Sequence, residues 1–328
     1  MTIKRNKTLD LAKGIAISLM VIGHCYSGEN YVLCVIYAFH MPFFFIVSGI
    51  LYGERWSQGI TFEFKKTAKK LLVPYYLAES LFAAFLSVLS KSDNVVKTFS
   101  NYLFHSIMPL VGVTATWFLP CMLITLCLFV LISKLIRNEK VQICVFSALF
   151  LVGLVFPSPP RVLVPLLRSF IGIGFFTAGY FGRVLFQKKS KPISLFITAI
   201  VFFVLACKNG QVSLVELNFS NPFLYVLNSI LGSYLLLQVC LRVPQARIPQ
   251  FFVTFSIHSS LILCAHVFLI EIGRLVDYKI LGSLLGKLKY SEGIVFGGIV
   301  LMIMYFVILI LDYLQKGRKH GKYRCPGL

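Results

Sequence analysis

Apolar windows long enough to cross a membrane recur along the whole chain, separated by short polar connections. A helix needs about 20 predominantly apolar residues to span the hydrocarbon layer, because each residue rises about 1.5 Å. The pattern therefore predicts an all-α integral membrane protein with about ten transmembrane helices. The predicted spans are residues 9–27, 31–53, 71–90, 115–133, 141–157, 162–182, 192–207, 220–240, 250–271 and 293–313. Since no connection is long enough for a soluble unit, we expect a single membrane domain over residues 1–328.

Basic residues gather in alternate connections, which predicts the orientation of the helices. Lys and Arg are concentrated before residue 9, after residue 313 and in the connections 54–70, 134–140, 183–191 and 241–249. Because cytoplasmic loops carry an excess of Lys and Arg, both termini are predicted to lie in the cytoplasm and the connection 91–114 outside. Lys13 interrupts the signal-like start and no small-residue cleavage site follows it, so the first span is expected to be retained.

The composition excludes a soluble globular domain. Hydrophobic residues make up 58% of the chain and charged residues 13%, against about 25% charged in soluble domains. The net charge of +20 is explained by basic cytoplasmic loops that meet anionic lipid, and nucleic-acid binding is not needed to account for it. The nine cysteines are scattered without a CxxC pair, so neither a metal site nor a disulfide framework is expected.

The first predicted span, LDLAKGIAISLMVIGHC at residues 9–25, carries Asp10, Lys13 and His24. Ionisable groups inside a bilayer are costly, and they indicate a functional site. Lys13 and His24 are about three helical turns apart, so they share one face and lie about 16 Å apart along the axis, with Asp10 on the same face. The simpler alternative is that Lys13 extends to the headgroups and His24 packs within the helix bundle.

Two further spans carry residues of possible chemical use. His40 falls about halfway along the second span, where Pro42 is predicted to kink the helix and free backbone groups. Arg168 lies inside the sixth span and needs an anionic or polar partner, for which Glu79, Glu271 or a sugar or lipid phosphate qualify. Helix packing and substrate binding are both open for these residues.

The connection before the third span contains KKTAKK at residues 65–70, directly before a helix expected to open with Pro74. The four lysines there can bind the phosphates of a cytoplasmic ligand. Alternatively, they only keep this connection on the cytoplasmic side of the membrane. Ser48 and Gly49, near the end of the second span, are predicted to permit close helix approach.

Six motifs occur in register along the chain: LDLAKGIAISLMVIGHC, FHMPFFFIVSGILYG at 39–53, KKLLVPYY at 69–76, TWFLPCML at 116–123, RSFIGIGFFTAGYFG at 168–182 and SSLILCAH at 259–266. Taken together they resemble the acyltransferase 3 family, ten-helix membrane enzymes that O-acylate sugars of cell-surface polysaccharides. The match is closest to small members without an attached soluble domain. The family's basic residue and histidine on the first helix fall on Lys13 and His24, although Arg is more frequent at the first position.

The resemblance implies roles for individual residues. His24 is expected to act as general base, since imidazole gains and loses a proton near neutral pH, with help from His40. A role in substrate binding is implied for Trp117 and for His266, which matches a histidine on a late helix of the family. The expected site comprises His24, Lys13, Asp10 and His40 as catalytic residues, Lys13, Lys66, Lys69 and Lys70 for the donor, and Trp117, Arg168 and His266 for the acceptor.

The expected function is transfer of an acetyl group from cytoplasmic acetyl-CoA to a sugar hydroxyl of a surface polysaccharide or its lipid-linked precursor, in the inner membrane of a bacterium. Acetyl-CoA is a co-substrate, and no permanently bound cofactor or metal is expected. A multipass transporter or flippase for a glycan intermediate is the alternative, because a polar stripe across the membrane also suits a translocation path.

Overall fold

A computed structural model describes residues 6–28, 30–57, 63–90, 94–156, 159–279 and 292–321; for residues 55–57 and 316–321 it describes the backbone alone. Residues 1–5, 280–291 and 322–328, whose charges enter the predicted orientation, lie outside this part of the chain. The described residues form twelve α-helices. They are α1 (Lys7–Cys25), α2 (Tyr31–Ser57), α3 (Phe64–Leu89), α4 (Val95–Tyr102), α5 (Phe118–Leu135), α6 (Glu139–Val155), α7 (Val164–Gln187), α8 (Pro192–Asn209), α9 (Pro222–Cys240), α10 (Gln250–Ile257), α11 (Ser259–Lys279) and α12 (Glu292–Gly321).

Nine of the helices in the described ranges are long and apolar enough to cross a membrane: α1, α2, α3, α5, α7, α8, α9, α11 and α12. The remaining predicted span, 141–157, corresponds to α6, which has 17 residues and packs against α7. The chain is therefore an all-helical, multi-pass membrane protein, as the hydropathy pattern predicted.

The helix expected over 250–271 is two helices, α10 and α11, divided at His258. The segment contains neither Pro nor Gly, the usual causes of a break, so the pattern gave no sign of it. Tertiary contacts lie at the division: Ser256 donates a hydrogen bond to Asp10 of α1, and His258 lies 3.4 Å from the Asp312 carboxylate of α12.

Two other boundaries differ from expectation. α3 begins at Phe64 and continues through Pro74, so the lysines of residues 65–70 lie on its first turns and not in a loop before it. Lys and Ala are good helix formers, and Pro removes only one backbone donor here. Part of the connection 91–114 is helical, as α4 followed by a π-helical turn over Leu103–Ile107.

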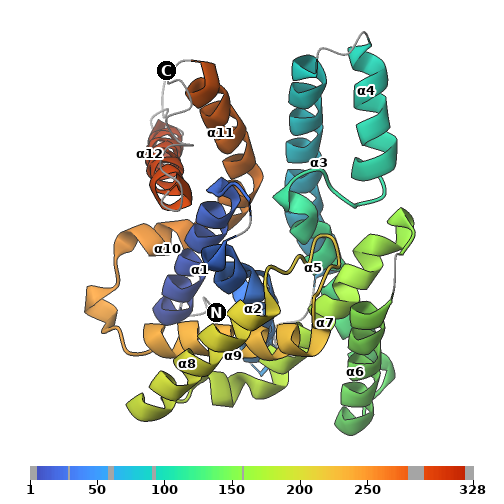
Figure 1. Cartoon of the computed structure of the whole chain (residues 1–328), viewed down its shortest axis with the longest axis vertical. Helices are drawn as coiled ribbons and strands as arrows, with labels where there is room; N and C mark the ends of the chain where they lie inside the picture. The colour runs from blue at the N-terminus through green and yellow to red at the C-terminus, as the bar shows by residue number, and fades with distance from the viewer. Residues whose placement is uncertain are drawn as a thin grey trace, which may run out of the picture.

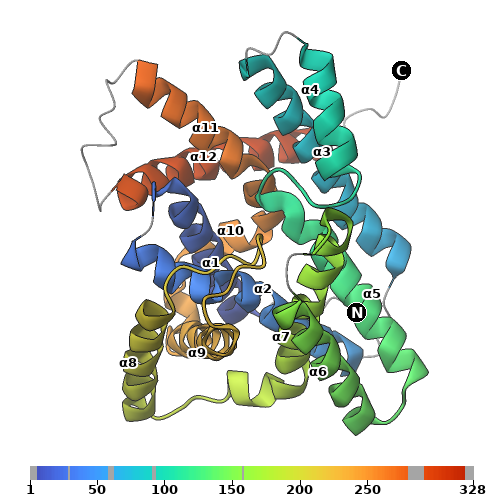
Figure 2. The same ribbon diagram turned by 45° about the vertical axis from the view of Figure 1, so that its right-hand side comes forward.

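α1 and α2 form the centre of the molecule (Figures 1 and 2). α1 contacts α2, α9, α10, α11 and α12, and α2 also packs against α7, α8 and α9. Glycines bring the central helices close: a Cβ at Gly14 would collide with the Phe252 carbonyl of α10, and one at Gly49 with the Phe176 carbonyl of α7. The predicted close approach at Gly49 is confirmed, and such contacts are typical of membrane helices.

The backbone group that Pro42 leaves free on α2 has a partner on another helix. Because Pro42 has no N–H, the Ala38 carbonyl loses its partner within the helix. Ser229 of α9 lies with its Oγ 2.8 Å from that carbonyl oxygen, and 2.7 Å from the Tyr225 carbonyl of its own helix. Ser229 therefore joins α9 to α2 two residues before His40.

Candidate active site

A cavity of about 260 Å³ lies at the carboxyl end of α1, between α1, α2 and two connections. Its helical lining includes Met20 and His24 of α1 and Tyr37, His40 and Met41 of α2. The short 3₁₀ turn Ala115–Trp117 before α5 and residues 211–216 between α8 and α9 complete the wall. In Figure 2 the connection from α8 to α9 passes in front of α1 and α2.

His24 of α1 and Tyr37 and His40 of α2 line this cavity with their rings, and His266 of α11 contacts His24 without being one of the lining residues. The ring centroids of His24 and His266 are 5.3 Å apart, which joins α1 to α11. The ring of Tyr37 is close to two histidines, with its centroid 6.2 Å from that of His24 and 5.1 Å from that of His40. Three predicted site residues, His24, His40 and His266, are thus brought into one cluster.

Backbone contacts define which nitrogen of two imidazoles carries the proton. His40 Nδ1 lies 2.9 Å from the Ile36 carbonyl oxygen, and His266 Nδ1 lies 2.8 Å from the Ile262 carbonyl oxygen. A carbonyl oxygen only accepts, so Nδ1 donates in both rings and the neutral ring presents the lone pair of Nε2. His266 Nε2 is buried and has no hydrogen-bond partner among the described residues. His266 is not among the cavity residues, so this acceptor lies within the packed helices beside His24.

His24 lies in the last turn of α1, where a neighbouring helix holds the backbone. Arg274 of α11 donates a hydrogen bond from Nη2 to the His24 carbonyl at 3.2 Å, and its Nη1 lies 3.5 Å from Glu271. A cation at a helix carboxyl end also complements the helix dipole. Gly23 leaves room for the Tyr37 ring, because a Cβ there would lie 2.9 Å from Tyr37 Cε1.

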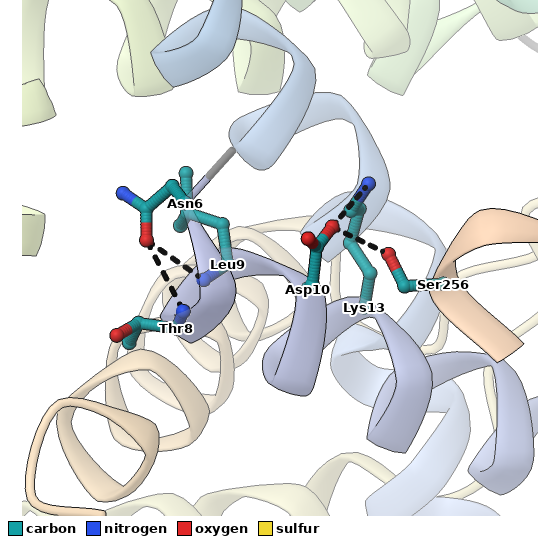
Figure 3. A network of polar contacts seen from close by, with 6 residues as sticks. All are labelled: Asn6, Thr8, Leu9, Asp10, Lys13 and Ser256. Atoms are coloured by element: carbon teal, nitrogen blue, oxygen red, sulfur yellow. Dashed lines mark hydrogen bonds and ion pairs between the residues drawn. The ribbon is translucent and has the colours of Figure 1, made fainter. Parts of the chain in front are cut away.

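The Asp10–Lys13 pair of α1 lies near the amino end of the helix and is not among the cavity residues (Figure 3). Lys13 Nζ lies 3.4 Å from Asp10 Oδ1, and Ser256 of α10 donates to the same oxygen at 2.8 Å. Asn6 caps the helix by accepting from the Thr8 and Leu9 amides. Asp10 is therefore joined to α10, and its partner Lys13 lies about 16 Å along the helix axis from His24.

The predicted donor residues of α3 are exposed at the start of that helix and do not line the cavity. Lys69 and Lys70 are exposed. Lys66 lies 3.7 Å from Glu63, in a pair that is itself largely exposed. An exposed pair of this kind contributes little to stability, so these side chains remain free to meet a ligand.

Arg168 is buried against Trp117, with its guanidinium carbon 5.0 Å from the centroid of the indole ring. It donates to the Val111 carbonyl at 2.7 Å and, through Nε at 3.0 Å and Nη2, to the Val215 carbonyl. The expectation that Glu79 or Glu271 is its partner is wrong. The guanidinium of Arg168 is hydrogen-bonded to backbone carbonyls instead. Glu79 accepts from the Val113 amide, and Glu271 pairs with Arg274.

The cavity residues that the sequence analysis did not single out include Tyr37, Gln211 and Glu216. Tyr37 precedes His40 by one helical turn, and this spacing was a signal that both side chains share a face. Gln211 and Glu216 come from the connection between α8 and α9, and no sequence pattern marks them. The Gln211 side-chain oxygen is buried and has no hydrogen-bond partner in the described part of the chain.

Within the described residues, no group of His, Cys, Asp and Glu side chains has the arrangement of a metal site. The family model for the acyltransferase domain (acyltransferase 3) matches residues 6–313. No curated protein and no solved structure matches the chain. The family match covers nearly every helix described above, including all those that form the cavity. The chain therefore belongs to the acyltransferase 3 family of membrane acyltransferases.

Proposed function

We propose that the chain transfers an acetyl group from cytoplasmic acetyl-CoA to a sugar hydroxyl of a surface polysaccharide or its lipid-linked precursor. The proposal places it as a single domain in a bacterial inner membrane, with both termini in the cytoplasm. The charge pattern supports this orientation, because connections rich in Lys and Arg alternate along the chain with connections that carry fewer of them. The cavity beside His24 is then on the outer side of the membrane, and the Asp10–Lys13 pair is on the cytoplasmic side.

The observation that carries the proposal is the group of His24, His40 and Tyr37 around one cavity, with His266 in ring contact with His24. His24 takes the proton of the acceptor hydroxyl while the hydroxyl oxygen attacks the thioester carbonyl. The carbon–sulfur bond breaks, and the proton passes to the thiolate of coenzyme A. The Tyr37 ring contacts the imidazoles of His24 and His40 on the same wall, and we assign its hydroxyl as the donor to the developing oxyanion.

Hydrogen-bond acceptors on the cavity wall support an acceptor rich in hydroxyl groups. They include the Gln211 side-chain oxygen and the carboxylate of Glu216. Trp117 adds an aromatic surface on the same wall. Aromatic faces and polar groups that fix orientation are the usual features of a small-molecule site.

The basic residues on the proposed cytoplasmic side are assigned to the donor. Lys13, Lys66, Lys69 and Lys70 supply positive charge for the phosphates of coenzyme A. Lys13 belongs to the helix that also carries His24, so one helix connects the donor entrance with the cavity. The pantetheine arm of acetyl-CoA must then extend along α1, so that its thioester reaches His24.

The test uses purified protein in nanodiscs and acetyl-CoA labelled in the acetyl group. Label should appear on an added glycan, with release of free coenzyme A, and His24→Ala should abolish the transfer while retaining donor binding. Label trapped on the protein in the absence of glycan would indicate an acyl-enzyme step. Binding without release of free coenzyme A for any glycan would contradict the proposal and favour a transporter.

A further inference from the structure

Glu79 is a fully buried carboxylate on α3 that makes all its described hydrogen bonds with one short stretch of backbone and side chains. It accepts from the backbone amides of Val113 and Thr114. It also accepts from the hydroxyls of Thr114 and Thr116. All four donors lie between α4 and α5, directly before Trp117.

Arg168 holds the same stretch from the opposite direction. Its Nη1 donates to the Val111 carbonyl, two residues before the amide that Glu79 binds. Gly112, which lies between Val111 and Val113, has φ +81°. Leu110, two residues before Gly112, has φ 63°. Positive φ is disfavoured for a residue with a side chain. The connection is thus fixed between a buried anion and a buried cation in a backbone shape that needs external support.

The fixed stretch forms the support of Trp117. A Cβ added at Gly112 would lie 3.1 Å from Trp117 Cβ, so the turn packs directly against that residue. Thr116, the neighbour of Trp117, is fully buried and bonds to Glu79. The guanidinium carbon of Arg168 also lies over the indole ring of Trp117, 5.0 Å from its centroid. The position of Trp117 in the cavity wall therefore depends on α3 as well as on its own helix.

We propose that Glu79 is a positioning residue for the acceptor: by holding residues 113–116 it sets the position of Trp117, and with it the affinity of the cavity for the sugar. This inference rests on the proposed function. A carboxylate is required because all four contacts are donors, and only an ionised carboxylate offers acceptors without a donor of its own. Gln at this position has the same shape, but its amide N–H₂ would face an N–H or O–H group.

The experiment uses the fact that the chain has two tryptophans, Trp56 and Trp117. In a Trp56→Phe background Trp117 is the sole tryptophan, and acrylamide quenching of its selectively excited emission reports how firmly the wall is held. Glu79→Gln should increase the quenching of Trp117. It should also raise KM for the glycan by about tenfold, the effect of one hydrogen bond to a charged group, with KM for acetyl-CoA nearly unchanged. Glu79→Asp, which retains the acceptors, should be intermediate.

Ser87→Ala is the matched control, because Ser87 is also buried on α3 but bonds only to the Ala83 carbonyl of its own helix. It should change neither reading. If Glu79→Gln does not give folded protein, Thr116→Val removes one donor and should change both readings in the same direction. Unchanged quenching or an unchanged glycan KM in a folded variant would overturn the inference. If the parent acetylates no glycan, the proposed function fails, while the quenching still decides whether Glu79 holds Trp117.

Discussion

His24 of α1, which lines the cavity, and His266 of α11 have their ring centroids 5.3 Å apart. His266 is fully buried and donates from Nδ1 to its own helix, and its Nε2 has no hydrogen-bond partner among the described residues. A substitution at His266 therefore changes the surroundings of the proposed general base without removing it.

We expect His24→Ala to lower kcat by about 10²-fold or more, the usual contribution of a general base, with acetyl-CoA binding retained. His266→Gln should lower kcat less, since it removes an orienting neighbour and leaves the base. His105→Ala is the control, because His105 is exposed and outside the cavity. The rates are measured on protein that elutes as a single species in detergent. Folded His24→Ala with the rate of the parent would show that His24 only packs.

Asp10 is predicted to contribute to stability as well as to the donor entrance. Asp10→Ala leaves Lys13 without this partner and removes the link to Ser256 of α10, so unfolding should become easier by about 3 kcal/mol. Ser256→Ala should cost about 1 kcal/mol, the value of one hydrogen bond. Thermal unfolding in detergent measures both. Equal losses for the two variants would indicate that the ion pair adds nothing beyond the hydrogen bond.

The lysines of α3 should affect donor affinity and not the chemical step. Lys69→Gln combined with Lys70→Gln is expected to raise KM for acetyl-CoA by about 3- to 10-fold at low ionic strength, and salt should reduce the difference. Lys189→Gln, an exposed lysine of another basic connection, is the control. An unchanged KM with a lower yield of protein would show that these lysines serve membrane insertion.

Ser229 is expected to stabilise α2 through the carbonyl that Pro42 leaves free. Ser229→Ala should cost about 1–3 kcal/mol, because the Ala38 carbonyl is then buried without this donor. Adding Pro42→Ala restores a backbone N–H to α2 and should recover part of the loss. Thr198→Ala is the control, since Thr198 is only half-buried and bonds to its own helix. A loss that Pro42→Ala does not reduce would assign the effect to packing. The unfolding midpoint is measured for the parent, for Ser229→Ala, for Ser229→Ala combined with Pro42→Ala, and for Thr198→Ala.

The orientation of the chain is tested by labelling single introduced cysteines in intact cells. Lys97→Cys lies on exposed α4, which we expect outside, and Lys189→Cys lies in an exposed basic connection expected in the cytoplasm. An impermeant maleimide should label position 97 above the background of the parent and leave position 189 unlabelled. The reverse result would invert the topology and move the cavity to the cytoplasmic side.

The sequence by itself determined the membrane character of the chain, most of its spans and the identity of the histidines. These properties are local, because the length and hydropathy of one segment decide whether it enters a bilayer. The spacing of Asp10, Lys13 and His24 on one helix was likewise readable, since helical periodicity relates residues of the same helix.

Only the tertiary structure decided which helices meet and what each polar group contacts. A membrane helix is apolar toward lipid and toward its neighbours alike, so its hydrophobic pattern does not show which face packs against which helix. For that reason the pairing of His24 with His266, the approach of residues 211–216 to the cavity and the division of α10 from α11 could not be predicted. The same holds for Arg168, whose partners are backbone carbonyls that every residue carries.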